Sequence, residues 1–218
     1  MISKIDDVFY LDVPNCFGSD EENYTSEEIE TIMDECDKNV ECRYGASKFV
    51  MLFDGSNKVV KIPMNGSWSY NYNDNADYDD PVWEPFATAD YCALEALIYE
   101  AAVEAGLEMF FASTVEAGRT SKGCGVPYYI SERVNTGYDY DYEYEPSDDS
   151  KKKAREMTNR GSVSIDFVAA ALDFYGEVLV KEFLDFVREW EINDLHDDNI
   201  GYRNDGSPVL LDYSGFRS

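Results

Sequence analysis

Histidine and paired cysteines are almost absent from this sequence. His196 is the single histidine among 218 residues, and no two of the five cysteines form a C-x-x-C pair. A structural zinc site needs four cysteine or histidine ligands at short spacings, so the sequence predicts none. An odd number of cysteines without a secretory signal is typical of reduced thiols and indicates a cytoplasmic location. The cysteines are Cys16, Cys36, Cys42, Cys92 and Cys124.

Long apolar runs and basic residues are also scarce. No apolar run approaches the roughly 18 residues that a membrane-spanning helix requires, so we expect no membrane partner. The segment MISKIDDVFYLDVPN has no basic region followed by an apolar stretch, and it predicts no secretory signal. Lysine and arginine number 18 against 45 aspartates and glutamates, which gives a formal charge of −27. Such a surface repels the phosphates of nucleic acids, so no direct nucleic-acid binding is expected.

What the sequence does contain is typical of a globular protein. Hydrophobic residues make up 44% of the chain and aromatic residues 15%, enough to form a core despite the charge. The length fits one large domain or two small lobes. The acidity has two interpretations. It either confers solubility alone, or it imitates DNA and occupies a basic cleft on a protein partner. Nothing in the sequence indicates an oligomeric state.

The first half of the sequence predicts an extension followed by strands. Residues 1–40 are acidic and contain one helix-like segment, SEEIETIMDECDK. Two β-rich runs, KFVMLF and KVVKIP, flank Asp54-Gly55, which predicts a hairpin. The stretch at 65–85 is rich in Asn, Asp and Tyr and predicts an irregular insertion.

The second half predicts mostly helices. A helix is expected over TADYCALEALIYEAAVEAGLE, followed by strands in MFFASTVE and VPYYISERV. The acidic and aromatic tract at 137–161 predicts a mobile loop. A long amphipathic helix then breaks near Gly176, and the tail forms a hairpin that turns at Asn204-Asp205-Gly206.

This order of elements predicts an α+β, bilobal fold with a β-rich amino-terminal lobe and a minimal, mostly helical carboxy-terminal lobe. The predicted boundaries are an extension at 1–40, a first lobe at 41–136, a flexible loop at 137–161 and a second lobe at 162–218.

The tail carries the pattern that indicates chemistry. Asp194 stands five residues before Asn199, and Asp212 follows thirteen residues later after the apolar run VLL. This is the spacing of D-x-x-x-x-N and D-F-G in kinases. There an Asp orients the attacking hydroxyl, while an Asn and a second Asp supply oxygen ligands to the Mg²⁺ that bridges the phosphates of ATP. In a chain with so many acidic residues, this spacing alone is weak evidence for a kinase site. The evidence is stronger because the residues stand at the ends of a predicted β-hairpin.

The first half supplies candidate nucleotide-binding residues. Lys61, in Val59-Val60-Lys61-Ile62, occupies the strand position where a kinase lysine binds the α- and β-phosphates. Gly45, Ser47 and Val50 lie at the position of the glycine-rich loop, although the other glycines of that loop are missing.

Two further groups complete the predicted site. Glu95, with Glu100 as second choice, lies in the first long helix, where a kinase glutamate pairs with the lysine. Glu132 and Val134 follow VPYYI at the position of the interlobe hinge, whose backbone would receive the adenine edge.

The segments DLHDDNIGY, GSPVLLDYSGF and KVVKIP resemble aminoglycoside- and choline-kinase-type phosphotransferases, and more closely the kinase-like proteins of bacteriophages. The resemblance covers residues 43–216. It implies a two-lobed kinase fold, ATP and Mg²⁺ as cofactors, and a phage protein acting in a bacterial cytoplasm.

The sequence also departs from that family. Tyr213 replaces the Phe of D-F-G, and Ile192-Asn193 replace His-Arg. The chain ends at Ser218, so we expect a form truncated after the D-F-G-type turn, with no activation segment. His196 is expected to brace the loop, because the proton-accepting role in this chemistry belongs to an Asp.

Two functions are consistent with these residues. The first is a kinase-like phosphotransferase that uses ATP and Mg²⁺ to phosphorylate a hydroxyl of a protein, itself included, or of a small molecule. The second is a catalytically weak, kinase-derived inhibitor whose acidic surface blocks a basic host factor or defence complex. Calcium loops are disfavoured, because NDNADYDD and DLHDDNIG lack the spacing of oxygen ligands with a closing Glu.

Overall fold

The computed structural model divides the chain into two compact units. Unit 1 comprises Met1–Ala93 and Val115–Ser131, and unit 2 comprises Leu94–Thr114 and Glu132–Ser218. The structure describes residues 40–44, 47–63, 66–69, 82–85, 90–119, 127–136, 144–158, 163–193 and 195–214. The predicted acidic extension at 1–40 therefore lies almost entirely outside the described residues.

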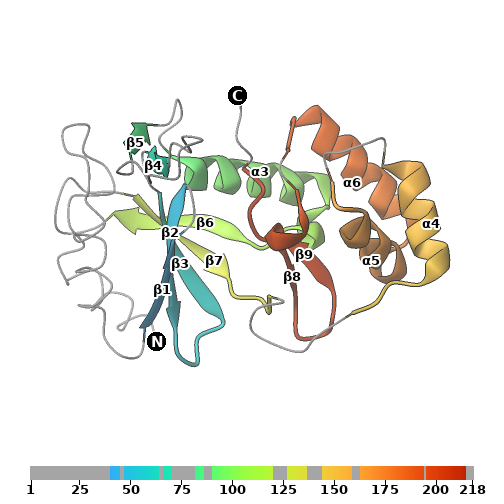
Figure 1. Cartoon of the computed structure of the whole chain (residues 1–218), viewed down its shortest axis with the longest axis horizontal. Coiled ribbons are helices and arrows are strands. Elements are labelled where there is room, and N and C mark those ends of the chain that lie inside the picture. The colour runs from blue at the N-terminus through green and yellow to red at the C-terminus, as the bar shows by residue number, and fades with distance from the viewer. Residues whose placement is uncertain are drawn as a thin grey trace, which may run out of the picture. The chain divides into compact units, whose positions relative to one another are not determined.

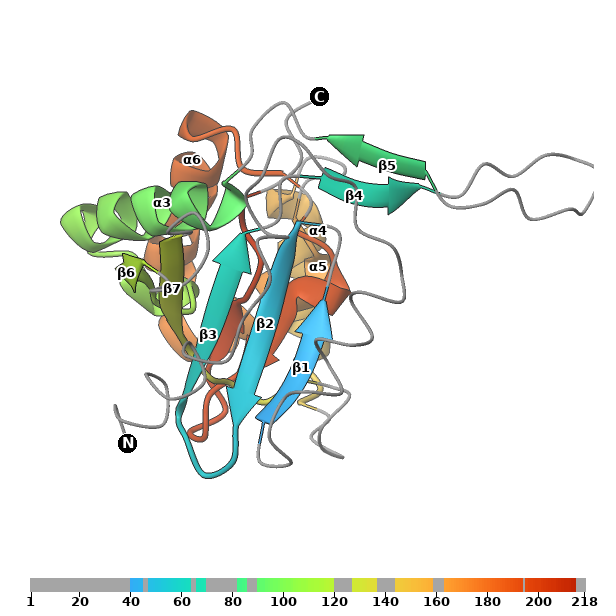
Figure 2. The same cartoon turned by 90° about the vertical axis from the view of Figure 1, so that its left-hand side faces the viewer.

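A five-stranded sheet dominates the described part of unit 1. In spatial order it contains β1 (Val40–Tyr44), β2 (Lys48–Phe53), β3 (Lys58–Pro63), β7 (Pro127–Glu132) and β6 (Thr114–Arg119). Figure 2 shows β2 and β3 in the middle, with β1 on one side and β7 and β6 on the other.

The predicted hairpin at Asp54-Gly55 is confirmed. Strands β2 and β3 pair antiparallel, with Val50 opposite Lys61. The turn needs a left-handed residue, and Gly55 provides it with a φ of 70°. Strand β1, which pairs antiparallel with β2, was not predicted from the sequence.

The expected irregular insertion at 65–85 is wrong at both of its ends. Strand β4 (Gly66–Ser69) pairs antiparallel with β5 (Val82–Pro85), and Trp68 is opposite Trp83. Two short strands that are separated in sequence become regular when each satisfies the backbone hydrogen bonds of the other.

Unit 2 is mostly helical. Helix α3 (Tyr91–Ala105) starts at the end of the first segment of unit 1 and continues into unit 2, and its predicted position is confirmed. Helices α5 (Ile165–Tyr175) and α6 (Glu177–Glu189) are separated at Gly176, as predicted, where the φ of 80° ends the first helix. Figure 1 shows both helices beside α4 (Asp148–Met157).

Helix α4 corrects the expectation of a mobile loop over 137–161. The Ser147 hydroxyl caps this helix by accepting a hydrogen bond from the Ser150 amide, and Asp148 and Asp149 fill the first turn. The charge that suggested a loop is therefore arranged as a helix requires. The rest of the tract, at 137–143 and 159–161, lies outside the described residues.

The predicted tail hairpin is confirmed. Strand β8 (Ile200–Tyr202) pairs antiparallel with β9 (Pro208–Leu210), and the short 3-10 helix η3 (Asp197–Asn199) leads into it. The expectation of a strand throughout MFFASTVE needs correction, because its start forms the 3-10 helix η2 (Glu108–Phe110) and β6 begins only at Thr114.

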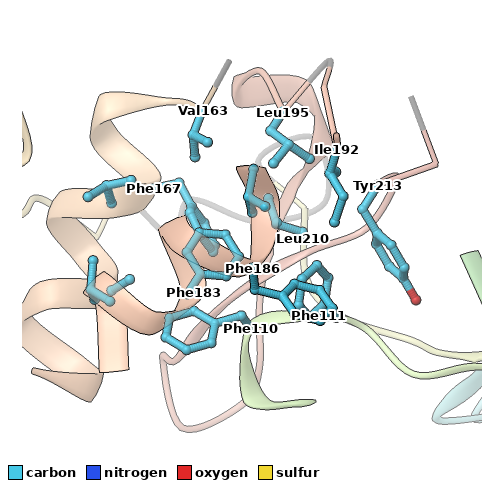
Figure 3. Packing of buried hydrophobic residues seen from close by; sticks show 14 of the residues in the cluster. Phe110, Phe111, Val163, Phe167, Phe183, Phe186, Ile192, Leu195, Leu210 and Tyr213 are labelled. Atoms are coloured by element: carbon cyan, nitrogen blue, oxygen red, sulfur yellow. The ribbon is translucent and has the colours of Figure 1, made fainter. Parts of the chain in front are cut away.

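Aromatic side chains form the core of unit 2. The ring of Phe110 stacks on Phe183 with centroids 4.5 Å apart, and Phe111 meets Tyr213 edge-on at 4.9 Å. Figure 3 shows these rings together with Phe186 and with aliphatic residues of the tail. Edge-on and offset pairs of this kind add to the stabilisation from burial alone.

The described residues are of α+β composition, with an antiparallel-rich sheet in the first part of the chain and helices mainly in the second. This confirms the predicted fold class and is consistent with a bilobal kinase-like fold. The predicted lobe boundaries themselves stay a prediction. Among the helices described, none has the length and apolar character needed to cross a bilayer.

Candidate functional site

Asn199 and Asp212 lie at the open end of the β8–β9 hairpin. Ile200 is opposite Leu210 in the last pair of the ladder, and the Leu211 amide donates to the Asn199 carbonyl at 2.8 Å. Asn199 therefore immediately precedes one strand and Asp212 closely follows the other. The two residues that the sequence predicts as metal ligands therefore lie at the same end of the hairpin.

The hairpin is attached to the core by backbone hydrogen bonds. Leu210 forms a parallel bridge with Phe111, and the Ala112 amide donates to the Leu210 carbonyl at 2.8 Å. Both strands are largely buried, which leaves them little freedom to shift. The segment that follows η2 thus holds the β9 backbone in place just before Asp212.

The loop before the hairpin is held by its neighbours. Leu195 forms a parallel bridge with Val163, and the Ser164 amide donates to the Leu195 carbonyl at 2.8 Å. The Ser164 hydroxyl also hydrogen-bonds the Asp197 carboxylate. The start of helix α5 therefore supports the residues on both sides of His196.

His196 organises the turn that contains Asn199. Its Nδ1 atom accepts a hydrogen bond from the Asp198 amide at 3.2 Å, and its carbonyl accepts from the Asn199 amide at 3.0 Å. Its Nε2 atom is 3.4 Å from the Asn199 side-chain nitrogen. These contacts are those of a residue that shapes the loop.

Arg203 clamps the hairpin to the end of β7. Its guanidinium makes a bidentate pair with Glu132, with Nε at 2.8 Å from Oε1 and Nη2 at 3.0 Å from Oε2. The same group donates to the carbonyls of Met109 and Phe111 at 2.8 and 3.2 Å. A bidentate pair between a guanidinium and a carboxylate is one of the stronger polar contacts in proteins.

The predicted hinge residues therefore contact the predicted metal hairpin. Besides its side-chain pair with Arg203, Glu132 donates its amide to the Ser113 carbonyl at 3.0 Å. Val134 lies against Gly201, where an added Cβ would be 2.4 Å from the Val134 Cγ2 atom. Only glycine allows this approach of the two segments.

Glu95 is fully buried within helix α3. The Thr114 hydroxyl donates to its Oε2 atom at 3.4 Å, which is long for a hydroxyl hydrogen bond. Burial raises the pKa of the nearby Tyr213 phenol well above its usual value, and the Glu95 carboxylate raises it further. Glu95, Tyr213 and Thr114 therefore lie in one buried polar cluster of unit 2.

Three of the predicted nucleotide-binding residues that the structure describes belong to unit 1. Lys61 is 6% exposed on β3, and Ser47 is equally buried just before β2. Val50 is half-buried on β2. Gly45 and the predicted catalytic residue Asp194 lie outside the described residues.

The chemistry of Asn199 and Asp212 fits Mg²⁺. This ion is usually held by one or two carboxylates, with water and substrate phosphates completing the shell. One amide oxygen and one carboxylate at the same hairpin end satisfy that requirement. No cluster of three or more His, Cys, Asp or Glu occurs in the part of the chain that the structure describes, so a cage built by the protein alone is not indicated there.

Sequence reasoning missed two residues that attach the turn end of the hairpin, away from Asn199 and Asp212, to the rest of unit 2. Nothing in the local pattern pointed to Arg203, whose partner Glu132 is 71 positions away. Tyr175 was also missed; its hydroxyl lies within hydrogen-bond distance of the Met109 and Pro208 carbonyls, at 3.1 and 2.9 Å, and donates its one proton between them. A partly buried tyrosine or arginine beside a polar turn is a signal only once the residues around that turn are known.

The chain was compared with known protein families, curated proteins and solved structures. No protein-family model matches the chain, and no curated protein matches it. Among solved structures, the chain resembles the GDP and kanamycin complex of APH(2″)-IIia, an aminoglycoside phosphotransferase. That likeness has a TM-score of 0.32 and 12% identity, and it covers 86% of this chain and 72% of that one.

Proposed function

We propose that the protein is a kinase-like phosphotransferase that uses ATP and Mg²⁺. The observation that carries the proposal is the position of Asn199 and Asp212 at the same open end of one hairpin, where the Leu211 amide donates to the Asn199 carbonyl. Their spacing in the sequence is that of the kinase metal-binding residues, and their shared position at one hairpin end supports the proposal. The acceptor would be a hydroxyl of a protein, itself included, or of a small molecule.

Each residue has a role in this proposal. Lys61 would bind the α- and β-phosphates, and Asn199 and Asp212 would hold Mg²⁺, which neutralises phosphate charge. Asp194 would orient the acceptor hydroxyl and take its proton as the oxygen attacks the γ-phosphorus and the bond to ADP breaks.

The remaining residues would support nucleotide binding. Glu95 would hold Lys61 toward the phosphates, and the backbone near Ser47 and Val50 would cover them. The backbone near Glu132 and Val134 would receive the adenine. Because the Glu132 amide is hydrogen-bonded to Ser113, a carbonyl of this segment is the better candidate for that contact.

Binding is tested first, by thermal unfolding with ATP and MgCl2. A ligand at 100 times its Kd stabilises a protein by about 2.7 kcal/mol, which for a chain of this size raises Tm by roughly 5–10 °C. Lys61→Met should reduce that shift strongly. A wild-type protein whose Tm does not respond to saturating ATP and MgCl2 would refute the proposal.

Transfer is tested with ATP labelled at the γ-phosphate. Asp212→Ala should abolish labelling of the protein or of added acceptors while the fold remains intact. Asp185→Ala removes an exposed carboxylate of α6 and serves as the matched control. Equal labelling by the wild-type and Asp212→Ala proteins would exclude a role for Asp212 in transfer.

A second candidate function rests on the charge of −27. We propose as the alternative that the protein blocks a basic host factor or defence complex in a bacterial cytoplasm, as a phage-encoded, kinase-derived inhibitor. Binding to such a partner should weaken strongly between low and high salt, and Asp194→Ala should leave it unchanged. An affinity that does not depend on salt would contradict charge mimicry.

A further inference from the structure

Tyr213 follows Asp212 and occupies the place of the phenylalanine in D-F-G. Its side chain is fully buried, and its hydroxyl donates to the Ala112 carbonyl at 2.8 Å. Figure 3 shows its ring beside Phe111 at the edge of the aromatic cluster, with the hydroxyl pointing away from the other labelled rings. A phenylalanine would fill the same space but would lack this hydrogen bond.

With the hydrogen bond of this hydroxyl, both residues next to Asp212 in the sequence are bonded to other segments. On one side, the Leu211 amide donates to the Asn199 carbonyl at 2.8 Å. On the other side, Tyr213 is tied to Ala112, whose own amide donates to the Leu210 carbonyl at 2.8 Å. The backbone of Asp212 is therefore fixed through both of its neighbours.

The Ser214 hydroxyl, 3.3 Å from Oδ1 of Asp212, makes a further polar contact in this turn.

We infer that the Tyr213 hydroxyl is a positioning group that holds the Asp212 turn in the orientation needed to bind Mg²⁺ with ATP. The inference rests on the proposed function and adds a residue to it. The D-F-G pattern has a phenylalanine at this place, and phenylalanine has no hydroxyl to make such a hydrogen bond. Tyr213 itself touches no reacting atom in this role and acts through the backbone of Asp212.

The test compares two Tyr→Phe substitutions. Tyr213→Phe removes the hydroxyl at the Asp212 turn, whereas Tyr175→Phe removes a hydroxyl that bonds two carbonyls at the other end of the hairpin. Each variant is titrated with ATP in MgCl2 and with ATP in EDTA. Loss of one buried hydrogen bond predicts about a tenfold weaker affinity of Tyr213→Phe in MgCl2, with no change in EDTA. Tyr175→Phe should match the wild type under both conditions.

A second measurement requires no nucleotide. Amide hydrogen exchange at Leu211 and Asp212 in the nucleotide-free protein should be faster in Tyr213→Phe than in Tyr175→Phe, after correction for global unfolding. Replacement of Tyr213 by 4-aminophenylalanine, which retains a donor at the same place, should restore slow exchange and Mg²⁺-dependent affinity. This rescue variant also covers the case in which Tyr213→Phe folds poorly.

The outcomes separate this inference from the proposed function. Wild-type affinity and wild-type exchange in Tyr213→Phe would overturn the role of the hydroxyl while the phosphotransferase proposal stands. A wild-type protein that does not bind ATP in MgCl2 would refute the proposed function and with it the Mg²⁺-positioning role. In that case the exchange data would show only whether the hydroxyl holds the turn.

Discussion

At the scale of single residues, Arg203 joins three segments of unit 2. It contacts the Glu132 carboxylate at the end of β7 and two carbonyls of the segment that includes η2, while its own backbone belongs to the turn between β8 and β9. Both partners of the ion pair are partly buried, with side chains 24% and 26% exposed. Removal of the guanidinium would therefore leave a carboxylate and two carbonyls without their donor.

We predict that Arg203→Ala lowers the free energy of unfolding by about 2 kcal/mol, since hydrogen bonds to charged groups are worth more than neutral ones. Urea unfolding measures the change. Arg188→Ala is the control, because Arg188 pairs with Asp185 on an exposed helix surface and should cost no more than about 0.5 kcal/mol. Equal losses in the two variants would mean that the Arg203 contacts contribute no more than a surface pair.

At the scale of secondary-structure elements, the charged side chains of α4 attach it to its neighbours. Glu177, at the start of α6, pairs with Lys153 of α4 and with Lys181 one turn along its own helix. These hydrogen bonds, first from Lys153 and then from Lys181, lower the pKa of Glu177 from 4.5 to about 2. Asp173 of α5 accepts further bonds from Ser147 and Ser150.

The lowered pKa of Glu177 predicts a pH-dependent contribution to stability. A carboxylate whose pKa is lower in the folded state stabilises the fold above its unfolded pKa, and that contribution disappears as the pH falls from about 4.5 to about 2. The Tm difference between wild type and Glu177→Gln should thus be larger at pH 6.5 than at pH 3. Thermal unfolding at both pH values measures it, with Glu182→Gln on the same helix as control. A difference that is the same at both pH values would contradict the ion-pair explanation.

At the scale of the whole molecule, the net charge opposes folding. A formal charge of −27 on 218 residues makes the compact state repel itself, because the excess carboxylates are brought closer together than in the unfolded chain. Local pairs such as Lys153 with Glu177 neutralise only a small part of this excess.

We therefore predict that Tm rises as NaCl increases from about 10 mM to about 300 mM, the range in which the Debye length shrinks from about 30 Å to below 10 Å. Most of the rise should occur in the lower part of the range, because screening saturates. Sucrose at equal osmolality is the control for general solute effects. A Tm that falls with added NaCl would show that attractive pairs outweigh the repulsion.

The sequence alone determined the parts of the protein that depend on local physics. Two β-rich runs around Asp54-Gly55 specified the β2–β3 hairpin, and Gly176 specified the break between α5 and α6. The tail hairpin followed from its turn residues, and its ends predicted the neighbouring positions of Asn199 and Asp212. Each of these features is decided within a few residues of the chain.

Tertiary structure decided what depends on distant partners. Helix α4 replaced the expected loop because Asp173 and Glu177 bond residues that are 23 to 26 positions earlier. The Tyr213 hydroxyl donates a hydrogen bond to the carbonyl of Ala112, which is 101 positions away in the sequence. No local pattern encodes such contacts, because they exist only after the core has brought the segments together.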